Sequence, residues 1–391
     1  MSTNPSAATG IIQSVYLDSA ATTQMREEVV MAMTQVLSNT YGNPSSTHSY
    51  GRESRALIET ARKQVAALMN VSAGEIIFTS GGTEADNIAI QCAVRDRGVM
   101  RIITSRIEHH AVLHTVENMA QYDVAVDFVD LMECGTPDLE HLRQLLEAND
   151  SKTLVSLMHV NNEVGNMIDV EAVGTLCREH DALFHCDMVQ SIGHFAVDLC
   201  ALKVDFTAAS AHKFHGPKGV GFAYVRKGSG LKPLIMGGGQ ERGLRAGTES
   251  VHNIVGLATA LQLAYDNLEE ERNYIQGLKS YMQSQLEKYI PDATFNGACA
   301  HEHKSTYTLL NVCIPCTPEK ALMLLFNLDL KGIACSKGSA CQSGAQSGSH
   351  VLREMQSESD QAKPSLRFSF SRYNTKEEID YVIQTLVDIL A

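Results

Sequence analysis

The sequence predicts an α/β protein with a mainly parallel sheet of seven strands, flanked by helices, and with a smaller α+β domain. Two observations support this prediction. Apolar runs of strand length alternate along the chain with longer segments of helix length, which is typical of a parallel sheet covered on both faces. The chain also has 391 residues, of which 44% are hydrophobic, and this is enough for a large core and a second, smaller one.

The apolar runs give the candidate strands of the large sheet in chain order. They begin near Glu75, Arg101, Ala125, Thr153, Ala182, Val204 and Val220. The helical patterns begin near Thr83, Ala111, Asp138, Val170 and Thr248. The last of these patterns continues to about Tyr289, and we interpret it as the bridge to the second domain.

Beyond this bridge the predicted elements form the smaller domain. They are a strand at 306–312, a helix at 318–328, a strand at 332–334, a strand at 366–370 and a helix at 376–389. We therefore expect residues 15–260 to form the large domain. Residues 1–14 and 261–391 are expected to form the small domain, which carries a Ser/Gly-rich loop at 334–349.

Charge and composition exclude several classes of function. The net charge of −13 argues against binding to nucleic acid or to an anionic membrane as a main activity. The first ten residues lack a basic start and an apolar signal core, and no apolar run reaches the about 20 residues that span a bilayer. Ten cysteines are too sparse for a disulfide scaffold. We expect a cytoplasmic protein whose cysteines are mostly free thiols.

A polar turn between two apolar runs carries the lysine of greatest interest. Residues 210–219 read SAHKFHGPKG, so Lys213 lies in a turn bounded by glycine and proline. A lysine there is either a solvated loop residue or a Schiff-base lysine that binds the aldehyde of pyridoxal phosphate (PLP). The turn alone favours the solvated residue.

An aspartate upstream changes that balance. Asp187 ends the apolar run 182–186, and its side chain can face the same cleft as Lys213 if both follow neighbouring strands. PLP acts as an electron sink while its pyridine nitrogen is protonated, and a buried carboxylate keeps that proton in place. Taken alone, Asp187 would be a helix N-cap or a turn residue.

The third element is a glycine turn before a predicted helix. An apolar run at 75–79 ends in Ser-Gly-Gly, and a helical segment begins at Thr83. A glycine such as Gly82 allows close backbone approach, and the N–H groups of a helix start bind phosphate. Such turns are also common as plain connectors, and this one matches neither the dinucleotide nor the Walker pattern. A phosphate cradle, a carboxylate and a lysine in this order predict PLP as the cofactor.

Half of the residues from 334 to 349 are serine or glycine, the composition of a flexible loop. Cys335 adjoins the apolar residues Ile333 and Ala334, so we expect it to be packed. Cys341 lies in the middle of the loop, where exposure suits a nucleophilic thiol. The alternative is an incidental loop cysteine.

Several ordered motifs make the chain similar to the cysteine desulfurases of the NifS/IscS type, within the fold-type I PLP enzymes. The motifs are YLDSAATT at 16–23, YGNPSS at 41–46, EHHAVL at 108–113, MHVNNEVG at 158–165, GGGQERGLRAGT at 237–248, GSAC at 338–341 and LRFSF at 366–370. The resemblance spans nearly the full chain. It implies a fold-type I homodimer that converts L-cysteine to L-alanine and transfers the sulfur as a persulfide on Cys341.

The resemblance also implies a role for individual residues. Lys213 would hold PLP and shuttle protons, Asp187 would pair with the pyridine nitrogen, and His109 would stack on the ring and serve in acid–base steps. Arg367 would bind the substrate carboxylate, and Cys341 would attack the substrate sulfur. The phosphate would be held by Thr83, Ser210 and His212, and by Thr248 of a partner subunit. The ring hydroxyl or the substrate would be contacted by Gln190 and Asn162.

Some features depart from the family pattern. Ser336-Lys337 replaces two serines, and a cation four residues from Cys341 could lower the pKa of that thiol. The chain ends at Ala391 soon after its last helical pattern, so the sulfur acceptor stays open between an iron–sulfur scaffold and a carrier for tRNA thiolation.

Three alternative functions and one alternative site stay open. The same fold supports a selenocysteine lyase or an aminotransferase, and a non-catalytic interaction subunit is a third possibility. The central thiol favours desulfuration over transamination. A four-ligand metal set is conceivable at His301, His303, Cys313 and Cys316, but Cys313 falls in an apolar strand, so we expect no metal.

Overall fold

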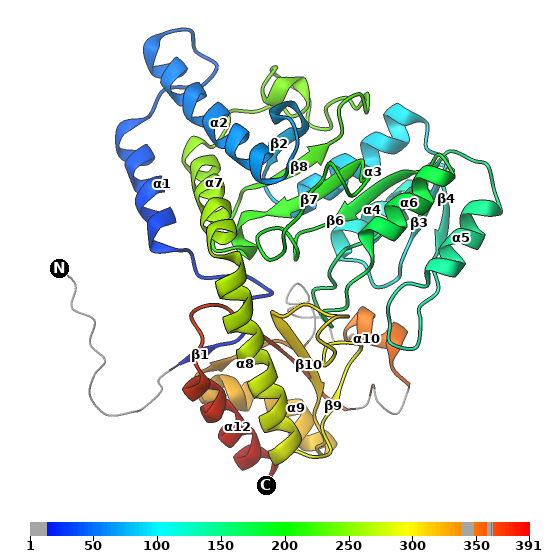
Figure 1. The fold of residues 1–391 in the computed structure, drawn as a ribbon, viewed down its shortest axis with the longest axis vertical. Coiled ribbons are helices and arrows are strands. Elements are labelled where there is room, and N and C mark those ends of the chain that lie inside the picture. The colour runs from blue at the N-terminus through cyan, green and yellow to red at the C-terminus, as the bar shows by residue number, and fades with distance from the viewer. Residues whose placement is uncertain (1–13, 338–347, 358–360, 362) are drawn as a thin grey trace.

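The computed structural model describes residues 14–337, 348–357, 361 and 363–391. Its largest element is a seven-stranded sheet with the order β2-β8-β7-β6-β5-β3-β4, in which β8 alone runs antiparallel to its neighbours (Figure 1). The strands are β2 Ile76–Thr79, β3 Arg101–Thr104, β4 Ala125–Phe128, β5 Thr153–Ser156, β6 Leu183–Asp187, β7 Phe206–Ser210 and β8 Gly221–Val225. This confirms the predicted mainly parallel sheet, and each strand begins within two residues of its expected position.

Helices cover both faces of this sheet because its buried strands carry apolar side chains on both sides. On one face lie α3 Gly82–Arg97 and α4 His110–Ala120. On the other face lie α2 Ser49–Leu68, α5 Leu139–Glu147, α6 Val170–Glu179 and α7 Val251–Asp266. Consecutive residues of β3 show the alternation, since Ile102 packs with α3 and α4 while Ile103 packs on the opposite face.

A second apolar cluster lies around a smaller antiparallel sheet of order β12-β10-β9 (Figure 1). Its strands are β9 Thr294–Phe295, β10 Leu309–Cys313 and β12 Ser365–Ser369, and its helices are α8 Leu268–Tyr289, α9 Pro318–Leu330 and α12 Lys376–Leu390. The short strand β1, Val15–Tyr16, pairs in parallel with β11, Ile333–Ala334, and so brings Val15 and Leu17 into this cluster. The expected domain limits at residues 15, 260 and 261 stay a prediction.

The long helical pattern expected over 248–289 is two helices, because the backbone leaves the helical conformation at Asn267. Three further α-helices of the described residues were not predicted, α1 Glu27–Asn39, α2 and α10 His350–Met355. Helix α1 buries only Val29 and Val36 and exposes other apolar side chains, so its sequence shows no clear core stripe. Among the described residues, no helix is long and apolar enough to cross a membrane.

Candidate functional site

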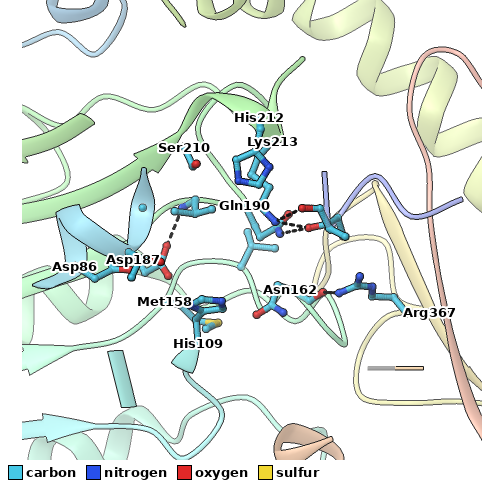
Figure 2. Close-up of a pocket in the computed structure, with 16 residues that line it drawn as sticks. Asp86, His109, Met158, Asn162, Asp187, Gln190, Ser210, His212, Lys213 and Arg367 are labelled. Carbon is cyan, nitrogen blue, oxygen red and sulfur yellow. Dashed lines mark hydrogen bonds between the residues drawn. The ribbon is translucent and has the colours of Figure 1, made fainter. Parts of the chain in front are cut away.

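A pocket lies where β6 and β7 end, at the carboxyl edge of the large sheet (Figure 2). In open α/β sheets this edge is the usual place for a ligand. Ten residues that the sequence singled out line this one pocket. They are Gly82, Thr83, His109, Asn162, Asp187, Gln190, Ser210, His212, Lys213 and Arg367.

Lys213 reaches the pocket from the short 3-10 turn Ala211–Lys213, which directly follows β7. Its Nζ donates to the backbone oxygens of Ala20 at 2.6 Å and Ala21 at 2.9 Å. His194 Nε2 lies 3.0 Å from the backbone oxygen of Lys213 and donates to it, which fixes the turn from behind. The lysine is thus a half-buried pocket residue rather than a solvated loop residue.

Asp187 is the last residue of β6, and its side chain is buried. Its Oδ1 accepts a hydrogen bond from the backbone N–H of Val189 at 2.8 Å, as in an Asx turn, and the segment that follows is not a helix. The pKa of Asp187 is raised to about 7, chiefly by burial and next by the neighbouring carboxyl group of Asp86, while the cation of Lys213 acts in the opposite direction. A positive group in the pocket would therefore stabilise the carboxylate.

The amino-terminal end of α3 forms one wall of the pocket. Gly81 is the N-cap residue of α3, and its φ of +155° favours glycine. No side chain caps this end of the helix. A Cβ on Gly82 would lie 2.5 Å from Cγ2 of Val189, so a side chain does not fit there. The first N–H groups of a helix have no partner within it, and Thr83 and Ser210 place hydroxyl groups beside them. Together they suit a phosphate.

His109 is the N-cap residue of α4, and its Nδ1 accepts the backbone N–H of Ala111 at 3.1 Å. The pKa of His109 is lowered to about 4, chiefly by burial and next by the charge of Lys213. The imidazole is therefore neutral at pH 7. Because Nδ1 accepts, the proton of the ring is on Nε2.

Arg367 projects from β12 of the smaller sheet into the pocket, where its guanidinium bonds to two segments that are distant in the sequence. Its Nη2 donates to Asp18 Oδ1 at 2.7 Å, and its Nη1 donates to the backbone oxygen of Asn162 at 2.8 Å. Its Nε is buried and has no hydrogen-bond partner among the described residues. Gln190 is tied to the same segment, since its Nε2 donates to the backbone oxygen of Ala20 at 2.9 Å.

Two expected site residues are not found in this pocket. Thr248 is exposed and lines a separate depression with Glu241 and Arg245. Cys341 lies outside the described residues. Cys335 packs against the cluster around β10 and β12, as expected, and burial raises the pKa of its thiol to about 12.

The possible metal set is not brought together. Within the parts of the chain that the structure describes, no group of three or more His, Cys, Asp or Glu side chains is placed to hold a metal ion. Cys313 is buried in β10, and Cys316 follows it at a half-buried position.

Three acidic residues around the site escaped the sequence analysis. Asp86 lines the pocket, Asp18 pairs with Arg367, and Glu108 is buried just before His109. A usable signal existed for Asp18 and Glu108, which belong to the motifs at 16–23 and 108–113. Asp86 lies one helical turn after Thr83, so its position on the same face of α3 could have been inferred.

Comparison with known proteins gives one family and close relatives. The aminotransferase class-V family model matches residues 15–382. The cysteine desulfurase IscS of Dictyoglomus turgidum is 39% identical over 379 residues, covering 96% of this chain and 94% of the relative. The putative cysteine desulfurase IscS 1 of Bacillus subtilis is 41% identical over 383 residues, covering 97% and 99%.

Solved structures agree with these relatives. A NifS-like protein superposes with a TM-score of 0.88 at 37% identity, covering 96% of this chain and 99% of that protein. SspA in complex with cysteine superposes with a TM-score of 0.77 at 31% identity, covering 92% and 99%.

Proposed function

Because this chain belongs to the class-V aminotransferase family, we propose that the pocket around Lys213 is the site of a PLP-dependent L-cysteine desulfurase. The enzyme converts L-cysteine to L-alanine and transfers the sulfur to an acceptor. The observation that carries this function is the shared pocket, in which the lysine, the buried Asp187 and Arg367 face one space.

The residues of the pocket fit PLP. The glycine cradle at Gly82 and the hydroxyl groups of Thr83 and Ser210 would hold its phosphate, while Asp187 would hold the proton of its ring nitrogen. Lys213 supplies the amine that binds its aldehyde. When bound, PLP supplies an electron-withdrawing ring that takes up electron density from the substrate carbon atoms.

The remaining side chains bind the substrate and handle its protons. Arg367 would bind the carboxylate of L-cysteine, with its guanidinium oriented by Asp18 and by the carbonyl of Asn162. The neutral His109 carries a proton on Nε2 and can donate it inside the pocket. Its low pKa keeps a second positive charge away from Lys213.

Sulfur transfer would fall to Cys341. Its thiolate attacks the sulfur atom of the substrate, an S–S bond forms, and the substrate Cβ–S bond breaks. The electron pair of that bond stays on Cβ, which takes up a proton and becomes the methyl group of L-alanine. The persulfide on Cys341 then passes its outer sulfur to an acceptor protein, either an iron–sulfur scaffold or a carrier for tRNA thiolation.

The test measures sulfide and alanine released from L-cysteine in the presence of PLP and a thiol reductant. The parent protein should release both in equal amounts, whereas a transaminase would form a keto acid without sulfide. Lys213→Ala should abolish turnover and the covalent attachment of PLP, which borohydride reduction and peptide mass spectrometry detect. Full turnover by Lys213→Ala would contradict the assignment of this lysine.

Two cysteine variants make a matched pair in the same assay. Cys341→Ser should keep PLP but lose sulfide release. Cys335→Ser should behave like the parent, because burial keeps that thiol protonated. After one turnover, mass spectrometry should find one added sulfur on the Cys341 peptide, and an added sulfur on Cys335 instead would overturn the role of Cys341.

A further inference from the structure

A second carboxyl group, that of Asp86, lies on the floor of the pocket near Asp187. Asp86 belongs to α3 and is three residues beyond Thr83, so both side chains lie on the same face of the helix. It lines the same pocket as Asp187, and its side chain is 1% exposed (Figure 2). The roles proposed above leave this carboxyl group without a function.

Asp86 faces His185, which is fully buried on β6. Asp86 Oδ1 and His185 Nε2 are 3.3 Å apart. The other ring nitrogen of the histidine, Nδ1, is 2.8 Å from Oγ of Ser156 on β5. Among the described residues, neither Asp86 Oδ1 nor His185 Nε2 has a hydrogen-bond partner of ordinary geometry. A buried polar atom without a partner costs free energy, so a proton between these two atoms satisfies both.

Strand geometry places this pair close to Asp187. His185 and Asp187 are two residues apart on β6, so their side chains point to the same face of the sheet, which α3 covers. Cys186, between them, packs in the cluster on the opposite face. The carboxyl groups of Asp86 and Asp187 therefore share one buried region on the α3 side of the sheet.

The protonation of the pair follows from burial. Burial raises the pKa of Asp86 to about 8 and lowers the pKa of His185 to about 4. At neutral pH the two groups are thus a carboxylic acid and a neutral imidazole. The arrangement that satisfies both ring nitrogens has Asp86 donating to Nε2, while Nδ1–H donates to Ser156 Oγ.

Other ionisable groups surround the two aspartates. Glu108 is buried, its Oε1 accepts the backbone N–H of Met158 at 2.9 Å, and burial raises its pKa well above the usual range. Burial likewise raises the pKa of the Cys186 thiol well above its usual range. Lys213 is the cation whose charge acts on Asp187 from across the pocket. Burial therefore disfavours the ionised forms of both Glu108 and Cys186.

We propose that Asp86 and His185 form an uncharged hydrogen-bonded pair on the pocket floor, and that this pair makes Asp86 a positioning residue for Asp187. Two carboxylates that share a buried region cannot both ionise without a large cost. Because the pair retains the proton of Asp86, the negative charge is reserved for Asp187. This inference rests on the proposed role of Asp187 in holding the proton of the ring nitrogen.

The first test follows the carboxyl ¹³C signals of the cofactor-free protein during a pH titration. In the parent, Asp86 should titrate near pH 8 and Asp187 near pH 7. Asp86→Asn keeps the size and the neutrality of the protonated acid. Because Asp86 is uncharged while Asp187 titrates, the midpoint of Asp187 in this variant should stay near that of the parent. Asp96→Asn removes a charge from the same helix about 15 Å further along and should leave the midpoint unchanged.

The second test uses the protein loaded with PLP and follows the absorption of the cofactor from neutral to alkaline pH. The parent and Asp96→Asn should show a spectral transition that accompanies ionisation of Asp86, and Asp86→Asn should lack it. If Asp86 only supported the fold, Asp86→Asn would still show this spectral transition.

Two results would overturn the proposal. One is an Asp86 signal in the parent that titrates near the ordinary value of about 4, which decides the matter even if the variant does not fold. The other is an Asp187 midpoint that falls in Asp86→Asn, because this would show that Asp86 in the parent is ionised while Asp187 titrates. If both titrations behave as expected but the parent releases no sulfide from L-cysteine, the proposed function fails and the pair stands.

Discussion

At the scale of single residues, Asp187 shows how a buried position prepares a charge for a ligand. Burial holds the pKa of this carboxyl at about 7, so its anion is costly until a positive partner arrives. The protonated ring nitrogen of PLP is such a partner. The same carboxyl is not needed to bind the phosphate, which the start of α3 would hold.

We therefore expect Asp187→Asn to retain PLP while turnover falls on the order of 100-fold or more, because an amide cannot stabilise the ring-nitrogen proton. The measurements are kcat for sulfide release and the amount of PLP that remains bound after desalting. Asp181→Asn is the matched control, since Asp181 is exposed in the turn before β6 and its left-handed φ of 51° suits asparagine. Equal turnover by Asp187→Asn and the parent would refute the pairing.

Sequence alone located Lys213 and Asp187 because each is a reactive residue type that directly follows an apolar strand. The spacing from Thr83 places Asp86 on the pocket-facing side of α3, but its burial could not be predicted, since an aspartate within a helix has the pattern of a solvated residue. Its burial arises only when α3 packs over β6. Asp18 was also missed as the partner of Arg367, because 349 residues separate the two in the chain.

At the scale of secondary-structure elements, the amino-terminal end of α3 is the part whose shape matters most to the cofactor. Gly82→Ala should weaken PLP binding by about tenfold, because the new Cβ meets Val189 Cγ2 and overpacking of this kind costs about 1–3 kcal/mol. Valine is stiff at χ1, so it cannot easily turn away. Titration of the cofactor-free protein with PLP measures the change.

Gly277→Ala is the matched control on another helix. Gly277 lies in α8, is exposed, and a Cβ there would meet nothing within 4 Å. Alanine should therefore leave PLP affinity unchanged and raise the free energy of unfolding by about 0.5–1 kcal/mol. An unchanged PLP affinity in Gly82→Ala would show that the cradle has more room than the contact with Val189 indicates.

Whether a helix or strand could be predicted depended on how apolar its core-facing side chains are. Six of the seven strands of the large sheet are largely buried on both faces and appear as short apolar runs, whereas the edge strand β4 is only partly buried. Helix α2 was missed because its inward face includes Arg62, which pairs in the interior with Glu241, at 2.6 Å between Nη1 and Oε2. In a sequence, the charged residues of a buried ion pair have the pattern of a solvent-exposed face. The break at Asn267 lacks a proline or glycine that would announce it.

At the scale of the whole molecule, Thr248 is exposed in a single subunit and lies outside the pocket of Lys213. The loop that carries it contacts the segment 41–46, since Gln240 Nε2 donates to Ser45 Oγ at 3.3 Å. Apolar side chains are also exposed on this segment, on α1 and before the loop. They are Val30, Met31, Leu37, Tyr41 and Met236. A second copy of the chain is the partner we propose for this surface, with Thr248 reaching the phosphate in the opposite subunit.

Dimers of two different variant subunits test this arrangement, because each site then carries a known combination of the Lys213 and Thr248 substitutions. In a dimer of one Lys213→Ala subunit and one Thr248→Ala subunit, the site that retains Lys213 would receive an intact Thr248 from its partner. Its PLP affinity should therefore equal that of the parent, whereas the Thr248→Ala homodimer should bind PLP more weakly in both sites. Differently tagged subunits allow the mixed dimer to be isolated, and light scattering confirms its mass. If Thr248 acted within its own chain, the mixed dimer would bind PLP as weakly as the Thr248→Ala homodimer.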